Sequence, residues 1–473
     1  MNAQLASVAR PGAPTVSRVG RAATVAALAA GAYMSALDNS IVYAVLPVVA
    51  QAFQTDLSAV EWVVTTYLLV QGALLLSFGR LGDLWGHKRV YMIGLSAFIT
   101  SSLLCGAAPG TPFLVAARAL QAVGASMVVS NMAPILTRVF PPEQRGRALG
   151  MQATTVYLGL ATGAPLGGWL TGVLGWRSVF YVNIPFGLIA LFLAWRVVKA
   201  DPPEDRRESF DILGAAVYAA GLVMLLLGLN QGHAWGWASP LTIGCLLLGV
   251  AILAAWVVIE LRMANPMLDL RLFAQRTFST PVVSSLLNYG ATATTTFLLP
   301  FALIQGRQLT PGQTGLVLMC QPIVMAVTAS FSGALSDKIG SRIPASLGMA
   351  TLSLGLFLLS RFVPTVPVPV IAATLVITGL GIGLFTSPNN SAVMGAVPQR
   401  RRGVASGVLS TARTLGNLLG IGLAGAVFTT SLAASDGGPE AIVASASIGL
   451  LVASGIALVG AVTSVTRPAP IVD

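Results

Sequence analysis

Two charged side chains lie inside long apolar stretches of the sequence, where ionisable residues are rare. Asp38 falls within residues 22–49 and Arg118 within residues 112–137. If both stretches are helices, Asp38 lies about 14 Å from Pro47 and Arg118 about 9 Å from Pro112, at 1.5 Å per residue. These depths are similar, so the two side chains could meet directly or through water. Ionisable residues within a membrane are costly and usually functional.

A carboxyl group in this setting suits a proton carrier. Burial favours the neutral form of a carboxyl and a nearby guanidinium favours the charged form, so Asp38 could bind and release a proton as its surroundings change. A permanent structural ion pair is the alternative. An arginine does not titrate in proteins, so Arg118 is expected to tune Asp38 or to bind substrate. Arg413, within residues 404–430, could line a cavity or extend toward the membrane surface.

Other kinds of site are disfavoured by the sequence. The two histidines are far apart, and the three cysteines show no CxxC spacing, so neither a zinc site nor a disulfide framework is indicated. No Walker A pattern is present, and the Gly379-Gly381-Gly383 run lies inside an apolar stretch. We therefore expect no catalytic residue, no metal, no cofactor and no nucleotide.

The composition indicates which elements position these residues. Hydrophobic residues make up 55% of the 473 residues and charged residues only 9%, with a mean hydropathy of +0.81. A soluble chain has roughly 25% charged residues, so most of this chain is expected to lie in lipid. Apolar stretches long enough to cross a bilayer as helices cover residues 22–49, 60–79, 90–108, 112–137, 148–171, 178–198, 212–229, 240–260, 280–303, 312–335, 344–362, 369–393, 404–430 and 440–465. A cleavable signal peptide is the alternative for the first stretch, but it exceeds a typical signal-peptide core.

The distribution of positive charge predicts the orientation of these helices. With a cytoplasmic N-terminus, only Arg177, Arg307 and Arg361 fall outside, and Arg118 and Arg413 lie within helices. The other 22 of the 27 lysines and arginines then fall on the inside, which is the positive-inside pattern. Both termini are therefore expected in the cytoplasm of a cell-membrane protein. This orientation accounts for the net charge of +11 without any nucleic-acid partner.

The sequence repeats itself in two blocks. The pattern Gly79-x-Leu81-x-Asp83-x-x-Gly86 returns 254 residues later as Gly333-x-Leu335-x-Asp337-x-x-Gly340. A second set returns 257 residues later: Gly146, Gly150, Thr154, Gly159 and Gly163 correspond to Gly403, Gly407, Thr411, Gly416 and Gly420. The chain is therefore expected to contain two homologous six-helix bundles, residues 22–198 and 280–465. Residues 199–279 would form a linker with two additional helices, and residues 1–21 and 466–473 would be cytoplasmic tails.

These motifs carry a resemblance to a known family. GRLGDLWGHKR at residues 79–89 resembles the loop signature of the major facilitator superfamily. Three further stretches resemble its fourteen-helix drug:proton antiporter family: Leu37 to Val42 with Leu46-Pro47, Arg118 to Gly124, and Gly159-x-x-x-Gly163-Ala164-Pro165-x-Gly167-Gly168. Trp176-Arg177 and Asn183-x-Pro185 also fit. The sequence departs from the family at Ala164, where Gly is usual, and at Tyr43, where Asn is common.

The resemblance implies a major facilitator fold with fourteen transmembrane helices, and it assigns roles to the motifs. We expect a gate that switches conformation at Gly79, Asp83, Gly86, Arg89 and Asp337, and a helix-five antiporter motif at Gly159, Gly163, Pro165, Gly167 and Gly168. In the gate, Asp83 could form an ion-pair set with Arg80, Lys88 and Arg89, or the loop could be a static clamp. Pro165 is a hinge candidate, with plain close packing as the alternative. Polar residues in apolar runs either line the cavity or bond neighbouring helices; these are Tyr43, Asn131, Asn288, Gln321, Asn389 and Arg413.

The function predicted from the sequence is proton-coupled export of small amphipathic compounds by alternating access. An importer or uniporter of one metabolite, and a receptor or scaffold without transport, are the alternatives. The partners expected are a small-molecule substrate, protons and the lipid bilayer, and the chain is expected to act as a monomer. One interior acid and up to two interior arginines favour neutral, zwitterionic or anionic substrates over dications, because a buried charge without a partner is costly.

Overall fold

The computed structural model describes residues 18–466, apart from residues 56, 201–209, 264–265, 267, 310, 434 and 436–437. Within these ranges all regular structure is helical, as predicted. The helices are α1 (Arg18–Ala52), α2 (Leu57–Trp85), α3 (His87–Gly106), α4 (Thr111–Val139), α5 (Arg145–Leu174), α6 (Ser178–Tyr181), α7 (Asn183–Val197), α8 (Ile212–Trp235), α9 (Pro240–Arg262), α10 (Arg276–Phe301), α11 (Pro311–Ile339), α12 (Arg342–Phe362), α13 (Val368–Gly395), α14 (Arg402–Ala433) and α15 (Pro439–Val465). Short 3-10 or π turns are η1 (Pro142–Gln144), η2 (Leu270–Ala274), η3 (Ala302–Gly306) and η4 (Gln399–Arg401).

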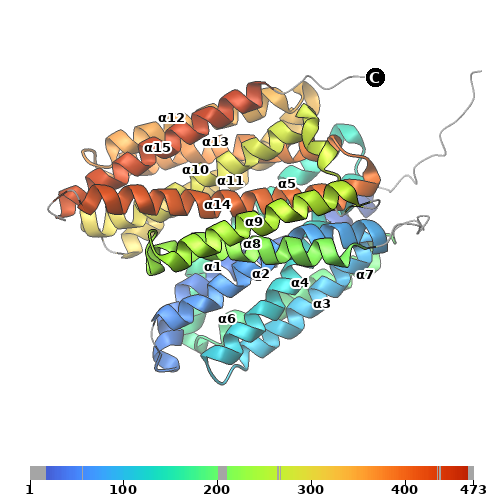
Figure 1. Cartoon of the computed structure of the whole chain (residues 1–473), viewed down its shortest axis with the longest axis horizontal. Coiled ribbons are helices and arrows are strands. Elements are labelled where there is room, and N and C mark those ends of the chain that lie inside the picture. Colours follow the sequence, from blue (N-terminus) through green and yellow to red (C-terminus); the bar gives the residue numbers. More distant parts are fainter. Residues whose placement is uncertain are drawn as a thin grey trace, which may run out of the picture.

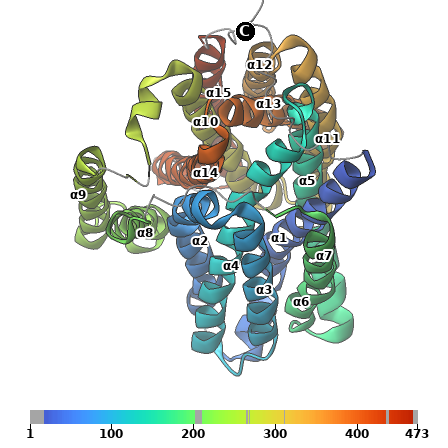
Figure 2. The ribbon, with the colours of Figure 1, turned by 90° about the vertical axis from the view of Figure 1, so that its right-hand side faces the viewer.

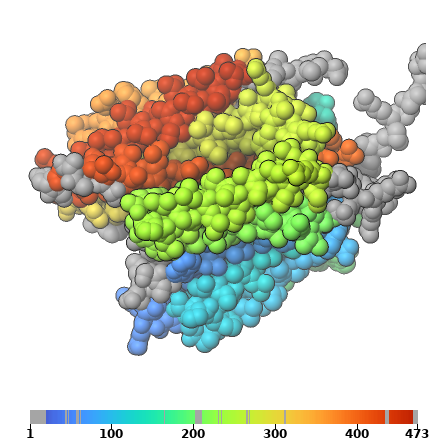
Figure 3. All heavy atoms as spheres, viewed as in Figure 1, coloured from blue at the N-terminus to red at the C-terminus, as the bar shows by residue number. Residues whose placement is uncertain are grey.

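The helices form two bundles with a hairpin beside them. Helices α1–α7 make the first bundle and α10–α15 the second, and the two lie one above the other in Figure 1. The α8–α9 hairpin lies along one side of the molecule, where α8 contacts both α2 and α14 (Figure 2). In the space-filling view the hairpin runs across the front face, over the line where the bundles meet (Figure 3). Helix α8 therefore touches both bundles.

Twelve helical spans in the described part of the chain are long and apolar enough to cross a membrane. They account for twelve of the fourteen predicted crossings; the exceptions are α5, with 30 residues, and α10, with 26. Both helices are long enough to span a bilayer, but they are rich in glycine, serine and threonine. These two helices can be less apolar because of where they lie. Helix α5 packs against α1 and α11, and α10 packs against α14 and α15. Several of their small residues face these neighbours, such as Gly159 and Gly163 against α1 and Gly290 against α14.

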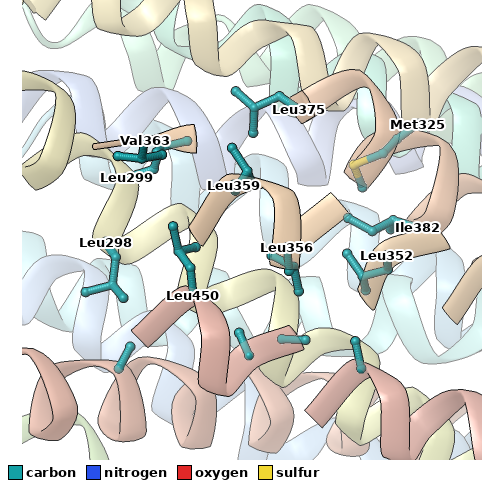
Figure 4. Packing of buried hydrophobic residues seen from close by; sticks show 14 of the residues in the cluster. Leu298, Leu299, Met325, Leu352, Leu356, Leu359, Val363, Leu375, Ile382 and Leu450 are labelled. Carbon is teal, nitrogen blue, oxygen red and sulfur yellow. The ribbon is translucent and has the colours of Figure 1, made fainter. Parts of the chain in front are cut away.

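Each bundle has its own apolar core. In the second bundle Leu352, Leu356 and Leu359 of α12 are fully buried and pack with residues of α10, α13 and α15 (Figure 4). Their spacing of four and three residues puts them on one face of the helix. A separate cluster joins Leu222 and Leu226 of α8 to residues of α2 and α14. The hairpin is thereby attached to the bundles by apolar contact.

The predicted inner loops gather at one end of the molecule, which we call the basic end. It carries residues 80–89, 138–147, 338–342 and 400–402, and contacts between these segments join both bundles. The chain turns sharply there at Gly86 and Gly340, which have φ angles of 96° and 82°. These are repeat-related positions, and a positive φ favours glycine. We call the opposite end, with residues 107–110, 175–177 and 363–367, the far end.

Candidate functional site

The first part of the site is a charge network inside the first bundle. Asp38 of α1 and Arg118 of α4 meet directly, with Arg118 Nη1 donating to Asp38 Oδ2 at 2.7 Å. Both side chains are almost completely buried, with exposed fractions of 0% and 1%. Their similar depths left contact directly or through water open, and the structure shows the direct contact. Their role in proton coupling stays a prediction.

Two amide side chains complete the network, and sequence reasoning did not select either as a site residue. Gln121, one helical turn after Arg118, donates to Asp38 Oδ1 at 3.1 Å and accepts from Arg118 Nη1 at 2.6 Å. Asn183, the first residue of α7, donates to Asp38 Oδ1 at 2.7 Å. The Asp38 carboxylate thus accepts three hydrogen bonds from two helices. Both amides lie within motifs that resemble the family, Gln121 in Arg118 to Gly124 and Asn183 in Asn183-x-Pro185. Their place in these motifs could have identified them as site residues.

Arg118 is also held from the side of α2. Its guanidinium lies 4.1 Å from the ring centroid of Tyr67, and its Nε donates to the Val63 carbonyl at 3.3 Å. Tyr67 is fully buried. The network therefore joins α1, α2, α4 and α7.

The second part of the site is a pair of contacts between the bundles at the basic end. Asp83 of α2 accepts hydrogen bonds from the backbone N–H groups of Gly403 and Val404 at 2.8 and 2.9 Å. Asp337 of α11 accepts from Gly146 and Arg147 at the same two distances. In each case a carboxylate of one bundle binds the first turn of a helix in the other bundle. A carboxylate is stabilised at a helix N-terminus by free N–H groups and the helix dipole.

Glycines let the helix backbones touch at these contacts. A Cβ atom added at Gly79 would overlap the carbonyl of Gly403, and one added at Gly403 would overlap the carbonyl of Gly79. The repeat-related pair Gly333 and Gly146 shows the same mutual overlap. The block with Gly79 and Asp83 therefore contacts the block that begins at Gly403 in the second bundle. The block with Gly333 and Asp337 contacts the block that begins at Gly146 in the first bundle. We call the two contacts the Asp83 latch and the Asp337 latch.

The two latches differ in their surroundings. His87 lies beside Asp83, with Nε2 3.4 Å from Oδ1, and its Nδ1 is 2.8 Å from Oδ1 of Asn131. Residue 341, at the position corresponding to His87, is a serine. Arg89, predicted to belong to the gate, lies over the ring of Trp85 at 5.7 Å. The predicted partners of Asp83 were basic side chains, whereas its recorded bonds to the other bundle are with backbone N–H groups.

Arginines add further contacts at the basic end. Arg402 Nη1 and Arg145 Nε both donate to the carbonyl of Thr137, at 3.0 and 3.1 Å. Arg402 belongs to the second bundle, so its bond to Thr137 is another polar contact between the bundles. Burial lowers the pKa of the Arg145 guanidinium from its ordinary value, and nearby Glu143 partly offsets this effect.

The helix-five motif packs within the first bundle. Cβ atoms added at Gly159 and Gly163 would press on α1, at Tyr33 to Leu37 and at Ser40 to Ile41 respectively. Gly167 is buried, whereas nothing lies within 4 Å of a Cβ added at Gly168. Helix α5 continues without a break through Pro165. The motif therefore serves close packing against α1, and its role as a hinge stays a prediction.

The third part of the site is a cavity between the bundles. It has an empty volume of about 680 Å³, including the space at its mouth. The lining comes from α4, α5, α10, α13 and α14: Val129, Ala133, Leu149, Gln152, Ala153, Val156, Tyr157, Ser285, Tyr289, Thr386, Asn390, Met394, Ser406, Leu409, Ser410 and Arg413. Arg413 therefore lines a cavity, which was one of the two expectations for it.

The other predicted lining residues are placed differently. Asn131, Asn288, Gln321 and Asn389 do not line this cavity and are at least nine-tenths buried. Asn131 donates to the Phe78 and Met127 carbonyls, Gln321 to Thr378, Asn389 to the Pro281 carbonyl and Asn288 to the Met349 sulfur. They bond neighbouring helices, which was the alternative considered for them. The side chain of Tyr43 lies outside the described residues.

Comparisons with known proteins agree over most of the chain. A model of the Major Facilitator Superfamily matches residues 28–261 and 282–471. Riboflavin transporter RibZ of Clostridioides difficile (strain 630) is 35% identical over 406 residues, which cover 85% of this chain and 87% of RibZ. Multidrug resistance protein Stp of Mycobacterium tuberculosis (strain CDC 1551 / Oshkosh) is 32% identical over 413 residues, 87% of this chain and 76% of Stp. The crystal structure of the human organic anion transporter MFSD10 (TETRAN) superposes with a TM-score of 0.66 at 16% identity, covering 94% and 99% of the two chains.

Proposed function

Because the chain belongs to the major facilitator superfamily, we propose that it is a proton-coupled exporter of small amphipathic compounds. It is a multi-pass membrane protein and a transporter, not an enzyme. Export would proceed by alternating access, with the two bundles rocking about a cavity between them. In this proposal the chain works as a monomer in the cell membrane.

The observation that carries the proposal is the Asp38 network. Asp38 is an acid in the interior of a transmembrane helix, fully buried and bonded to Arg118, Gln121 and Asn183. Its three donors stabilise the carboxylate. A change in the packing of α1, α4 and α7 would weaken these bonds and favour protonation, so rocking of the bundle and proton binding would be linked.

The proposed topology has fourteen crossings, and α5 and α10 are the two that are less apolar than the rest. The basic end then lies in the cytoplasm, as the positive-inside rule requires. The Asp83 and Asp337 latches would close the cytoplasmic side in the conformation described above, and Gly79, Gly86 and Arg89 would support the same gate. Opening toward the cytoplasm requires both latches to release.

Transport of a single metabolite is the second candidate. It is favoured by the relative named as a riboflavin transporter, which shares 35% identity. The relative named as a multidrug resistance protein favours the first candidate. A panel of structurally unrelated fluorescent compounds, tested for accumulation in an efflux-deficient host, separates the two. Protection against several unrelated compounds indicates a multidrug exporter, and transport of one compound class indicates the second candidate.

The variant Asp38→Asn tests the proposed coupling. We expect it to abolish proton-driven uptake of a retained fluorescent compound into everted vesicles, because the amide cannot take up and release a proton. Binding of the same compound to the purified variant should stay within about threefold of wild type. Proton release on adding the compound, measured with a pH-sensitive dye in weak buffer, should vanish.

Glu440→Gln is the matched control. Glu440 is an exposed acid in the first turn of α15, and its loss should leave both transport and proton release unchanged. Near wild-type uptake against a gradient by Asp38→Asn would show that proton coupling does not depend on Asp38.

A further inference from the structure

Arg413 is a charged side chain without a recorded counter-ion in the membrane-spanning part of the molecule. It lies eleven residues into α14, about 16 Å from the start of the helix. No hydrogen bond or ion pair of its side chain is found among the described residues, and its guanidinium lies 5.9 Å from the ring centroid of Tyr289. Holding an unpaired charge in this position is costly, and structures keep such charges where they have a function.

Three acids of the helices are engaged away from this cavity. Asp38 is bonded to three donors within the first bundle, and Asp83 and Asp337 bind helix termini at the basic end. None of the sixteen residues that line the cavity is acidic, and Arg413 is the one charged residue among them. The sixteen lining residues therefore supply one positive charge and no carboxylate to balance it, which suits a ligand that brings a negative charge of its own.

The remaining lining is suited to an organic molecule. Gln152 of the first bundle has only the sulfur of Met132 as an acceptor, at 3.4 Å, and Asn390 of the second bundle has no recorded side-chain bond among the described residues. Two tyrosines, Tyr157 and Tyr289, and several aliphatic side chains supply apolar surface. The combination of a guanidinium, uncommitted amides and aromatic rings matches a flat molecule with one anionic group.

Comparison with Arg118 supports this interpretation. Arg118 is also an interior arginine stacked on a tyrosine, yet its guanidinium has a carboxylate, an amide and a carbonyl as partners. Arg413 has the corresponding tyrosine and none of these partners among the described residues. A carboxylate of a ligand would supply the missing acceptor, with the bidentate geometry that a guanidinium favours.

We propose that Arg413 binds the anionic group of the transported compound, so that the preferred substrates are amphipathic aromatic monoanions. This rests on the proposed transport function and specifies the substrate class of the same cavity. The anionic group lies at Arg413, the amides of Gln152 and Asn390 donate to it or to neighbouring polar atoms, and the ring system packs against Tyr157 and Tyr289.

A charge series on one ring system tests the proposal. The probes are naphthalene-1-carboxylate, naphthalene-1-carboxamide and 1-naphthylmethylammonium, which share their aromatic part and differ in charge. Binding to the purified full-length protein in nanodiscs is measured by equilibrium dialysis. We expect the wild-type protein to bind the carboxylate at least about tenfold more tightly than the amide or the ammonium, as a charge-assisted hydrogen bond implies.

Variants at position 413 separate charge from shape. Arg413→Gln should weaken binding of the carboxylate to the level of the amide and leave binding of the amide unchanged, which also shows that the variant is folded. Arg413→Lys should keep part of the preference because it keeps the charge. Arg361→Gln is the matched control, since Arg361 stacks on Phe357 at 5.4 Å but lies exposed on α12, outside the cavity.

The outcomes distinguish this proposal from the export function. Equal carboxylate binding by wild type and Arg413→Gln, or no carboxylate preference in the wild type, including failure of all three probes to bind, overturns the anion site. Proton-driven transport that survives Asp38→Asn overturns the coupling and leaves a carboxylate preference at Arg413 unaffected. Loss of the preference in Arg413→Gln together with retention in Arg361→Gln supports the anion site.

Discussion

The two ends of the molecule are held together in different ways. At the basic end the bundles touch backbone to backbone, at Gly79 with Gly403 and at Gly146 with Gly333, and carboxylates bind helix termini across the interface. At the far end the recorded polar contacts lie within one bundle. Arg177 donates to the Ala108 carbonyl, and Arg307 to those of Val363 and Val366.

Helix α5 shows the change along its length. From Gly146 to Tyr157 its recorded contacts include α11 and α13 of the second bundle. Farther along, Gly159 and Gly163 face α1, and nothing lies within 4 Å of a Cβ added at Gly168 or Gly172. Close backbone contact between the bundles is therefore found at the basic end and not along the far half of α5, as far as its described residues show. If the protein works by alternating access as proposed, this difference predicts that the cycle depends on releasing the contacts at the basic end.

The largest effect is expected from a side chain placed at the close contact between Gly79 and Gly403. In Gly403→Val the new carbon atoms would overlap the carbonyl of Gly79 and the carboxylate of Asp83, so the basic end cannot close. Transport should be lost. The effect of the variant on the conformation is measured by maleimide labelling of a cysteine introduced at Ser406, with the reagent on the basic side of vesicles of known orientation. Labelling should be at least about tenfold faster than without Gly403→Val, because the variant shifts the population toward the state that is open at the basic end.

The control for this variant is Gly455→Val on α15, where nothing lies within 4 Å of an added Cβ. It should transport and label like the wild type. Unchanged labelling of Ser406→Cys in the Gly403→Val background would show that the glycine crossing does not close the basic end.

A smaller effect is expected from the latches, and here the two repeats should differ. Asp83→Asn removes a carboxylate that binds the start of α14 and also lies beside His87. Asp337→Asn removes a carboxylate that binds the start of α5, where serine stands at the position corresponding to His87. A charge at a helix terminus contributes up to about 2 kcal/mol in partly buried sites. Transport by Asp83→Asn should therefore fall by roughly tenfold, and that by Asp337→Asn by less.

Affinity separates a latch from a binding site. The dissociation constant for the naphthalene probes, measured beside the transport rate, should stay within about twofold of wild type in both variants. A large loss of affinity with unchanged turnover would contradict the latch role. Equal rate losses in the two variants would show that His87 adds nothing to the Asp83 latch.

The smallest effect is expected at the far end. Gly168→Ala adds a methyl group into open space on α5, so its melting temperature and transport should match those of the wild type, or rise slightly because alanine favours a helix. Gly159→Ala should be less stable, since the added methyl group meets Ala36 at 2.8 Å. Thermal unfolding followed by fluorescence-detected size exclusion measures both. A destabilised Gly168→Ala would show that the far end is packed more tightly than described.

The sequence predicted the helices and the repeats because both depend on patterns along the chain. Apolar stretches mark helices, and the offset between Asp83 and Asp337 marks related bundles. The depth of Asp38 and Arg118 follows from counting residues, and their ion pair bears this out. The partners of the latches could not be predicted, because nothing in a repeat says which helix of the other bundle it touches.

Cavity lining was the least predictable feature. Asn131 and Asn389 are buried between helices, whereas Asn390, next in the chain to Asn389, faces the cavity. A polar residue in an apolar stretch needs a hydrogen-bond partner in either place, so its type alone does not distinguish them. Whether such a residue faces the cavity or a neighbouring helix depends on the direction of its side chain around the helix axis and on how the bundles pack.

The reciprocal latches have an evolutionary consequence. Each bundle contains one block that supplies the carboxylate and one block that supplies the helix terminus, at Asp83 and Gly146 in the first and at Asp337 and Gly403 in the second. Two copies of a single such bundle, related by a two-fold axis, would form both contacts at once with no new residue, because a two-fold interface pairs each patch with its counterpart. A self-complementary homodimer is thus a sufficient ancestor for this interface. Gene fusion would then free the halves to diverge, one toward the buried acid Asp38 and the other toward the open arginine Arg413.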